Sequence, residues 1–335
     1  MNALIPLLQF LVCALLIGFA GHKLTRYAGV ISAKTGLPSS WIGLVLLSTA
    51  TSLPELSTGI SAVTLFDTPD IAMGDALGSC ILNLAMLVAL DALSRDEPIY
   101  ARINQSHVLT AGFGIILIGI VGLTILSAGT VVGRALYHVS AYTPLIVLIY
   151  FVAIRATFMH ERRLTITSPH TEAPDPLGLR QAVLRYAAAA IVVAIAGSLL
   201  PSVGLQIAVA TGWEAGFVGT LFVALATSLP EFVVIVSALQ RNSPDMAIAA
   251  LLGSNLFDIL VIALDDLAYA EGSIFAAVSP AHAASALAAV IMNGIFVVAL
   301  LYRPKNRFFG TISWTGLSLV SIYFFSAYFI YLYGA

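Results

Sequence analysis

One acidic six-residue motif occurs twice, far apart in the sequence. The segment Ala-Thr-Ser-Leu-Pro-Glu begins at Ala50 and recurs unchanged from Ala226. Proline lacks an amide hydrogen and crowds the carbonyl group four residues back, so Pro54 and Pro230 should free the carbonyl oxygens of these two alanines and kink their helices. Each copy therefore offers backbone, hydroxyl and carboxylate oxygens to one site.

The similarity between the two copies continues downstream. Gly78-Ser79 followed by Asn83 in the first copy corresponds to Gly253-Ser254 followed by Asp258 in the second. Side chains four residues apart share one helix face, so Ser79 with Asn83, and Ser254 with Asp258, each present two oxygen-bearing groups together. The candidate ligands are Ala50, Thr51, Ser52, Glu55, Ser79 and Asn83 from the first copy and Ala226, Thr227, Ser228, Glu231, Ser254 and Asp258 from the second.

This donor set consists of hard oxygen atoms, which suit Ca²⁺, Na⁺ or Mg²⁺, and it has no histidine or cysteine spacing typical of zinc or copper sites. Three carboxylates without a basic residue would repel one another unless cations bind between them. Two simpler interpretations remain: the glutamates bond only to Ser or Thr across helices, and individual serines merely pack between helices. We expect a cation site and no other cofactor.

The elements that position these residues are membrane helices. Of the 335 residues, 59% are hydrophobic and only 10% are charged, which excludes an ordinary soluble domain. A net charge of -2 excludes nucleic acid as a partner, and the two cysteines are expected to pack as small apolar residues. Apolar stretches of spanning length predict an all-α integral membrane protein with ten transmembrane helices, near 4–21, 41–66, 71–93, 108–126, 136–157, 181–200, 216–239, 246–268, 281–301 and 311–333.

Basic residues predict the orientation, because Lys and Arg gather on the cytoplasmic side. All of the 15 Lys and Arg residues except Arg134 fall in or beside alternate connections. Both termini are therefore predicted outside the plasma (cell inner) membrane, and the polar stretch 158–179 is predicted to be a cytoplasmic linker. The linker joins two five-helix halves, 1–157 and 180–335.

The motifs begin on the second and seventh predicted spans, within repeats at about 41–93 and 216–268. These spans are five apart, so the second copy enters the membrane from the opposite side, which makes an inverted-topology repeat. Such repeats build secondary transporters with the substrate site near the midplane. A duplication kept only for packing is disfavoured, because a mid-membrane carboxylate costs about 2.5–3.5 kcal/mol.

At these residues the sequence resembles the cation/Ca²⁺ exchanger superfamily, and most closely its Na⁺/Ca²⁺ exchangers, whose alpha-repeat signature is similar to Ala50–Glu55 with Gly78–Asn83 and to the second copy. The resemblance implies that Glu55 and Glu231 bind Ca²⁺ together with backbone oxygens of Thr51 and Thr227. It also implies that Asn83, Asp258 and the serines complete flanking Na⁺ sites, and that the first and sixth spans slide over a fixed core.

The sequence departs from the family pattern in two places. Alanine replaces the glycine that usually precedes the motif, and the usual Gly-Asn of the partner helix is Gly74-Asp75 in one copy and Ala249-Ala250 in the other. Asp75 is an unexpected acid; we expect it either to line the outer approach to the site or to be a solvated residue at the start of its helix.

The leading hypothesis is a Na⁺/Ca²⁺ antiporter rather than an enzyme. Three Na⁺ would neutralise three carboxylates, whereas one Ca²⁺ would leave one negative charge, which predicts electrogenic 3:1 exchange. The alternative is a Ca²⁺/H⁺ exchanger on the same fold, although a carboxylate at Asp258 favours Na⁺. K⁺ co-transport, a cation channel and an intramembrane aspartyl protease have less support. The expected partners are Ca²⁺, Na⁺ or H⁺ and the lipid bilayer, with no obligate protein partner evident.

Overall fold

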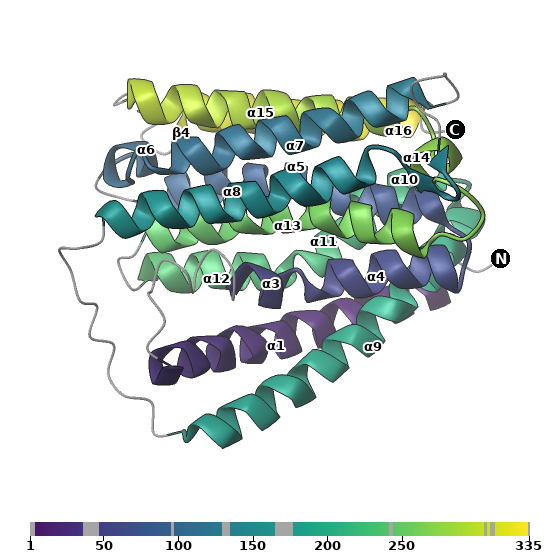
Figure 1. Cartoon of the computed structure of the whole chain (residues 1–335), viewed down its shortest axis with the longest axis horizontal. Helices are drawn as coiled ribbons and strands as arrows, with labels where there is room; N and C mark the ends of the chain where they lie inside the picture. The colour runs from purple at the N-terminus through teal and green to yellow at the C-terminus, as the bar shows by residue number, and fades with distance from the viewer. Residues whose placement is uncertain are drawn as a thin grey trace.

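The computed structural model is a bundle of long helices that lie nearly side by side, with both chain ends at one end of the bundle (Figure 1). It describes residues 4–35, 47–94, 97–128, 135–164, 177–240, 244–304, 307–308 and 312–333. We refer to the two ends of the bundle by the short helices found there, α6 (Ile99–Arg102) at one end and α14 (Ile274–Ala277) at the other. The chain termini lie at the α14 end.

Eight helices within the described residues are long and apolar enough to cross a membrane. They are α1 (Leu4–Thr35), α5 (Pro69–Leu93), α7 (His107–Ser127), α8 (Thr143–Leu164), α9 (Leu179–Thr211), α13 (Pro244–Ala268), α15 (His282–Tyr302) and α16 (Trp314–Tyr333). The chain is thus a multi-pass, all-α membrane protein.

The remaining helices are shorter, and most of them belong to the two motif segments. They are α3 (Ser48–Thr51), α4 (Leu53–Thr64), α10 (Ala215–Val218), the π-helical turn η3 (Gly219–Val223), α11 (Ala224–Thr227) and α12 (Leu229–Gln240). The stretches Ala215–Thr227 and Leu229–Gln240 form one bent pair that makes a ninth candidate span. The predicted second span, 41–66, begins outside the described residues, so the count of ten stays a prediction.

The fifth predicted span begins later than expected, at Thr143 rather than residue 136. The preceding residues form a two-stranded antiparallel hairpin of β1 (Ala135–Leu136) and β2 (Val139–Ser140). Asp266 explains this boundary, because it accepts hydrogen bonds from the Ser140 amide at 2.8 Å and from the Thr143 hydroxyl. A second hairpin, β3 (Arg307–Phe308) with β4 (Ile312–Ser313), precedes α16.

Two other predicted boundaries also move. Helix α8 continues to Leu164, into the predicted linker, and α9 spans 33 residues, well beyond the predicted 181–200. Gly212 ends α9 in the left-handed conformation, at φ 77°, which glycine adopts without steric cost. Most of the predicted linker that remains, 165–176, lies outside the described residues.

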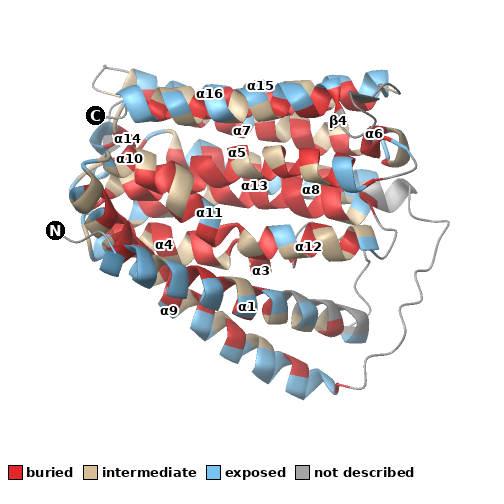
Figure 2. Ribbon diagram, turned by 180° about the vertical axis from the view of Figure 1, so that it is seen from behind, coloured by how far each residue is buried: buried red, intermediate tan, exposed pale blue. Residues whose placement is uncertain are grey.

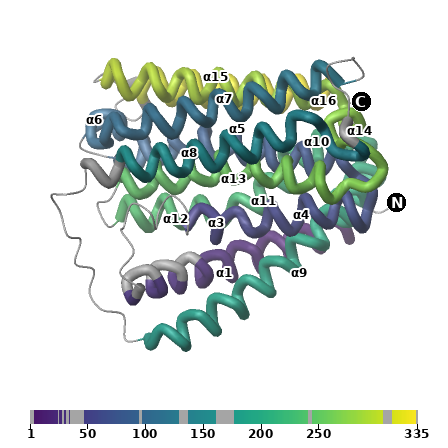
Figure 3. The backbone as a smooth tube through the Cα atoms, viewed as in Figure 1, coloured from purple at the N-terminus to yellow at the C-terminus, as the bar shows by residue number. Residues whose placement is uncertain are grey.

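Helices α5 and α13 form the buried centre of the bundle, as the red ribbon in Figure 2 shows. Helices α1 and α9 lie together along one edge (Figure 3) and pack on α12 and α4. On the other side α15 packs against α7, α16 and α5. The two motif helices α4 and α12 therefore lie between the α1–α9 pair and the central helices.

Hydrogen bonds at their ends show that α5 and α13 run antiparallel. The last turn of α5 carries Asp91, which accepts the Ile99 amide of α6, and the first turn of α13 carries Asp245, which accepts the Asn104 amide just after α6. At the opposite end, Asp266 near the end of α13 accepts the Ile274 amide of α14.

The same contacts recur 175 residues apart. His107 at the start of α7 lies 2.9 Å from Asp245 in the first turn of α13, and His282 at the start of α15 lies 3.1 Å from Asp70 in the first turn of α5. The first turn of each central helix therefore contacts the start of the long helix that follows the other central helix. Such matched pairs are what a duplicated unit inserted in opposite directions would produce.

We predict that Asp266→Asn lowers the thermal stability of the purified protein. Asp266 accepts hydrogen bonds from two amides and two hydroxyl groups, and hydrogen bonds to a charged group are worth about 1.5–3 kcal/mol each. The apparent unfolding temperature in detergent should fall by several degrees, while Glu271→Gln, at an exposed carboxylate near the same end, should leave it unchanged. An unchanged midpoint in Asp266→Asn would contradict this role.

Candidate functional site

Both motif segments break at the serine that precedes the leucine and proline. Helix α3 ends at Ser52 (φ -87°, ψ 16°) and α11 ends at Ser228 (φ -81°, ψ 8°). Pro54 lies in the first turn of the following helix, where its missing amide is tolerated. The second segment bends by 44° at this break. The predicted interruption of both helices is therefore confirmed within the described residues.

All twelve predicted ligand residues are buried, with at most 3% of their surface exposed. We call these twelve residues the central cluster. They lie on α3, α4, α11, α12, α5 and α13, so the two copies of the motif meet in one region rather than forming separate sites.

Glu55 is held from the second half of the chain through a short relay of hydroxyl groups. Ser79 on α5 donates to Glu55 Oε1 at 3.4 Å, and Ser228 donates to Ser79 at 3.0 Å. Ser79 also lies 3.5 Å from the hydroxyl oxygen of Thr227. One motif glutamate is thus connected to the serine and threonine of the other motif.

Glu231 is held in the matching way from the first half. Its Oε1 atom accepts hydrogen bonds from Ser52 at 3.3 Å and from Ser254 at 3.2 Å. Ser254 lies 3.2 Å from the hydroxyl of Thr51, which itself donates to the carbonyl of Ser48. Each glutamate therefore accepts a hydrogen bond from a serine on the central helix of its own half, α5 or α13. Glu231 also accepts one from Ser52 of the opposite motif.

The two central helices meet through amide side chains. Asn83 on α5 donates to Asn255 Oδ1 on α13 at 2.9 Å, and Asn255 donates to the Cys80 carbonyl at 3.3 Å. The Cys80 thiol lies 3.8 Å from Asp258 Oδ2. Asn83 and Asp258 are thus placed on either side of one α5–α13 contact.

Asp75 is not a solvated helix-start residue, which was one of the two expectations for it. It is 1% exposed and accepts a 2.8 Å hydrogen bond from the Thr227 hydroxyl, which also contacts the carbonyls of Val223 and Ala224. Close packing allows this contact, because a side chain at Gly74 or Gly78 on α5 would collide with Thr220 of η3. Asp75 therefore borders the central cluster directly.

Several buried acceptor oxygens have no hydrogen-bond partner among the described residues. They are Glu55 Oε2, Asp75 Oδ2, Asn83 Oδ1, Glu231 Oε2 and Asp258 Oδ1. A buried acceptor left unpaired costs free energy, and more so for a carboxylate. A cation satisfies acceptors of this kind, so the donor chemistry of the central cluster fits a bound cation.

The structure does not gather the carboxylates into one compact metal site. Within the described ranges, no three His, Cys, Asp or Glu side chains lie close enough to hold a metal ion by themselves. A cation in this conformation would therefore use hydroxyl and backbone oxygens beside one or two carboxylates, which is ordinary coordination for Ca²⁺.

Two residues of the network were not among the predicted ligands. Asn255 directly follows the repeated Gly253-Ser254, and this position within the repeat is the sequence signal that points to it. Cys80 occupies the equivalent place in the first copy and was interpreted as apolar packing; it is fully buried, yet its thiol contacts Asp258 and the Asn255 carbonyl.

The helices α1 and α9 touch the two motif prolines through equivalent glycines, 176 residues apart. A side chain at Gly21 on α1 would collide with Pro230, and one at Gly197 on α9 would lie 3.0 Å from the Pro54 carbonyl oxygen. Thr58 also donates to the Gly197 carbonyl at 3.1 Å. Each edge helix therefore approaches the break of the opposite motif without an intervening side chain.

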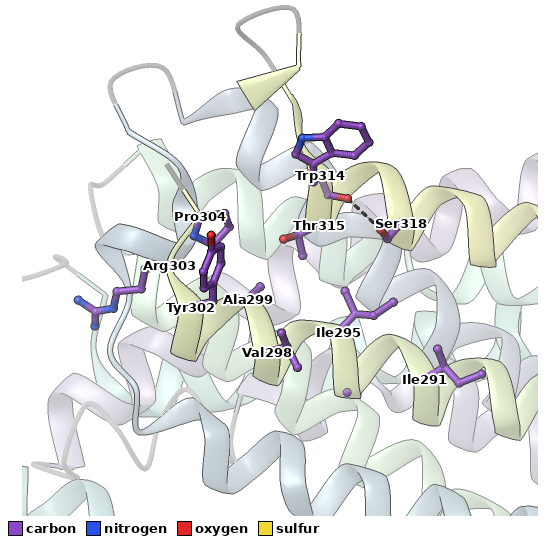
Figure 4. A pocket seen from close by; sticks show the side chains of 11 residues that line it. Ile291, Ile295, Val298, Ala299, Tyr302, Arg303, Pro304, Trp314, Thr315 and Ser318 are labelled. Atoms are coloured by element: carbon purple, nitrogen blue, oxygen red, sulfur yellow. Dashed lines mark hydrogen bonds between the residues drawn. The ribbon is translucent and has the colours of Figure 1, made fainter. Parts of the chain in front are cut away.

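A separate cavity lies away from the central cluster. It has a volume of about 910 Å³ between α15 and α16 and is lined by apolar side chains with Arg303 and Trp314 toward one end (Figure 4). No residue of the central cluster lines it, so it is not the cation site.

Comparison with known proteins agrees with this architecture. A family model described as "Sodium/calcium exchanger protein" matches residues 5–159 and 181–333. The inner membrane protein YrbG of Escherichia coli strain K12 is 24% identical over 75% of this chain and 76% of its own length. The putative antiporter CaxA of Alkalimonas amylolytica is 23% identical over 77% of this chain and 79% of its own.

Two solved structures share the fold. The sodium-calcium exchanger NCX_Mj, soaked with Na⁺ and Sr²⁺, aligns with a TM-score of 0.63 at 20% identity over 97% of this chain and 98% of its own. Native YfkE aligns with a TM-score of 0.66 at 18% identity over 96% and 91%. Since the family model covers both halves, the chain is a member of the sodium/calcium exchanger protein family.

Proposed function

We propose that this protein exchanges Na⁺ for Ca²⁺ by alternating access, with the central cluster as the shared ion site. One observation carries this proposal. Glu55 and Glu231, one from each half, are both buried and hydrogen-bonded through one carboxylate oxygen, and the second oxygen of each has no partner among the described residues. The paired free oxygens suit a divalent cation held between the two halves.

The flanking residues suit smaller cation sites. Asn83 and Asp258 each have an unpartnered oxygen, and the serines beside them supply neutral oxygens. We assign Ca²⁺ to the two glutamates with the backbone oxygens of Thr51 and Thr227, and Na⁺ to the flanking positions. The fold shared with NCX_Mj, which is named a sodium-calcium exchanger, supports this assignment.

The carboxylates Glu55, Glu231 and Asp258 set the proposed stoichiometry. Three Na⁺ neutralise three carboxylates, whereas one Ca²⁺ leaves one negative charge in a medium of low dielectric constant. Asp75 is left out of the count because it borders the central cluster and is not one of its twelve residues. The proposed exchange is therefore 3 Na⁺ for 1 Ca²⁺ and moves net charge across the membrane.

The basic residues support an orientation in the cell membrane. Arg102 and Arg303 lie at the α6 end and line one polar pocket there. With Lys and Arg on the cytoplasmic side, the α6 end faces the cytoplasm, and the α14 end with both chain termini faces outside. We place the protein in the plasma membrane of the cell.

A Ca²⁺/H⁺ exchanger is the second candidate, and Asp75 is the observation in its favour. This buried acid adds a fourth carboxylate beside the central cluster. A protonated carboxylate carries no charge and needs no coordinating shell, so a site with excess acid can exchange protons for Ca²⁺.

The first test is Ca²⁺ uptake into proteoliposomes that are loaded with Na⁺ and diluted into choline medium. We expect rapid uptake by the wild type and a loss of at least about tenfold, or about 1.4 kcal/mol, in both Glu55→Gln and Glu231→Gln. Glu214→Gln, at an exposed glutamate, is the matched control and should transport normally. Uptake driven by a pH gradient without internal Na⁺ would favour the proton-coupled alternative.

The second test imposes a membrane potential across the same vesicles with K⁺ and valinomycin. Because three Na⁺ leave for each Ca²⁺ that enters, one net positive charge moves outward, and each 100 mV is worth about 2.3 kcal/mol for that charge. A potential that is negative outside should therefore speed Ca²⁺ uptake, and the opposite potential should slow it. Rates independent of the potential would rule out the 3:1 stoichiometry.

The third test concerns the edge helices. Gly197→Ala places a methyl group 3.0 Å from the Pro54 carbonyl oxygen, so we expect slower turnover with little change in Ca²⁺ affinity. Gly112→Ala on α7, where an added Cβ meets nothing within 4 Å, is the control. If Gly197→Ala transports at the wild-type rate, the contact between α9 and the motif does not limit the movement between the two access states.

A further inference from the structure

One buried carboxylate lies outside the central cluster and has no role in the exchange described above. Asp265 lies in the last turn of α13 and is 0% exposed, and neither of its carboxylate oxygens has a hydrogen-bond partner among the described residues. It follows Asp258 by seven residues, two helical turns or about 10 Å toward the α14 end. Its neighbour Asp266, by contrast, accepts several hydrogen bonds.

Asp265 packs against a glycine of the first motif helix. A Cβ atom added to Gly59 on α4 would lie 2.6 Å from Asp265 Oδ1 and would also collide with Oδ2. The carboxylate therefore occupies the space that a side chain at residue 59 would fill. This contact lies one turn beyond Glu55 on α4, between the central cluster and the α14 end.

The repeat itself shows that packing does not require this carboxylate. The residue equivalent to Asp265 in the first half is Leu90, which is 0% exposed, and the residue equivalent to Gly59 in the second half is Ile235, which is 1% exposed. Both belong to the main hydrophobic core. One half thus fills these positions with two aliphatic side chains, and the other with a carboxylate and a glycine.

We propose that Asp265 is a proton-binding site that exchanges with the medium at the α14 end, separate from the cation cluster. A proton needs one carboxylate oxygen, whereas Na⁺ or Ca²⁺ needs several oxygens around it. Among the described residues, no group of three His, Cys, Asp or Glu side chains could hold a metal ion at Asp265, and both of its oxygens lie against Gly59. A neutral acid is also far less costly to bury without a partner than a carboxylate ion.

The groups around Asp265 are acidic rather than basic. The charges that act on it are those of Asp75 on α5 and Asp266 on its own helix. The other titratable groups whose side chains are described, on α13 and on the helices packed against it, are Asp70, Cys80 and Asp91 on α5, Glu55 on α4, Glu231 on α12, Asp245 and Asp258 on α13, His107 on α7, Tyr100 and Arg102 on α6, and Tyr150, Arg155 and His160 on α8. Beside the end of α13, the His138 ring lies 3.3 Å from the Leu267 carbonyl oxygen, and Tyr269 directly follows the helix. The helices α3 and α14 and the strand β2 carry no titratable side chain.

The consequence for transport rests on the proposed antiport and its orientation. In the conformation that the structure shows, both the central cluster and Asp265 are buried. When the protein passes from the state open at the α14 end to this conformation, Asp265 must therefore take up a proton from the outer medium. Raising the outer pH above the pKa of this carboxyl group should then slow this step, by up to about tenfold per pH unit.

The transport experiment measures Na⁺-driven Ca²⁺ uptake at saturating external Ca²⁺ as the outer pH is raised and the inner pH is held constant. Saturating Ca²⁺ removes competition between protons and Ca²⁺ at the glutamates. The key variant is Asp265→Leu, which has the same number of side-chain heavy atoms and copies Leu90 of the other half. We expect the wild type to slow at high outer pH and Asp265→Leu to keep a flat profile, with Glu271→Gln behaving like the wild type.

A second measurement does not depend on transport. Infrared difference spectra of the reconstituted wild type between neutral and alkaline pH should show the carbonyl stretch of buried protonated carboxyl groups, and Asp265→Asn should lack one component of that band. If the wild type takes up no Ca²⁺, the proposed antiport fails while the infrared test still decides the proton site. Identical pH profiles of the wild type and Asp265→Leu, or an unchanged band in Asp265→Asn, would overturn the inference.

Discussion

The central constraint on this molecule is that carboxylates are buried where water cannot solvate them. Glu55, Glu231 and Asp258 are almost completely buried, and each retains an oxygen without a hydrogen-bond partner among the described residues. Burying an unpaired charge is costly, so these groups are stable only when a cation or a proton is bound. In the proposed exchange, ion binding is thereby coupled to the closing of the site, which is the requirement for an antiporter rather than a channel.

The surrounding helices meet this constraint in a symmetric way. Each of the antiparallel helices α5 and α13 presents a hydroxyl group to the motif of its own half. Ser79 on α5 donates a hydrogen bond to Glu55, and Ser254 on α13 donates one to Glu231. The breaks at Ser52 and Ser228 turn the motif segments so that these hydroxyls also reach across to the other half. Neither half would complete the site alone, because each glutamate is connected to groups from both copies.

The symmetry is incomplete in ways that bear on chemistry. At equivalent positions of the repeat, the first half has Asn83 where the second has Asp258, and Cys80 where the second has Asn255. Likewise, Asp265 is equivalent to Leu90, and Gly59 is equivalent to Ile235. The scaffold contacts, such as the two Asp–His pairs at opposite ends, are kept in both halves. The differences lie at or near the central cluster, and they give the two halves different chemistry there although the scaffold contacts are alike.

The sequence by itself determined much of this. Hydropathy located the spans because a membrane helix must be apolar over its whole length, and exact repetition of Ala-Thr-Ser-Leu-Pro-Glu identified both motifs and the family. Proline chemistry predicted the breaks that the structure shows. Helix ends were less predictable: the start of α8 at Thr143 depends on Asp266, which is distant in sequence.

Tertiary structure alone decided which oxygens are free and which are bound. Spacing puts Glu55 on a helix face, but only the crossing of α5 and α13 shows that Asn83 meets Asn255, that Asp75 reaches Thr227, and that Asp265 lies against Gly59. The physical reason is that hydrogen bonding between helices depends on their relative position and rotation. These are set by the packing of glycines and other side chains across the whole bundle, whereas periodicity reports one helix at a time.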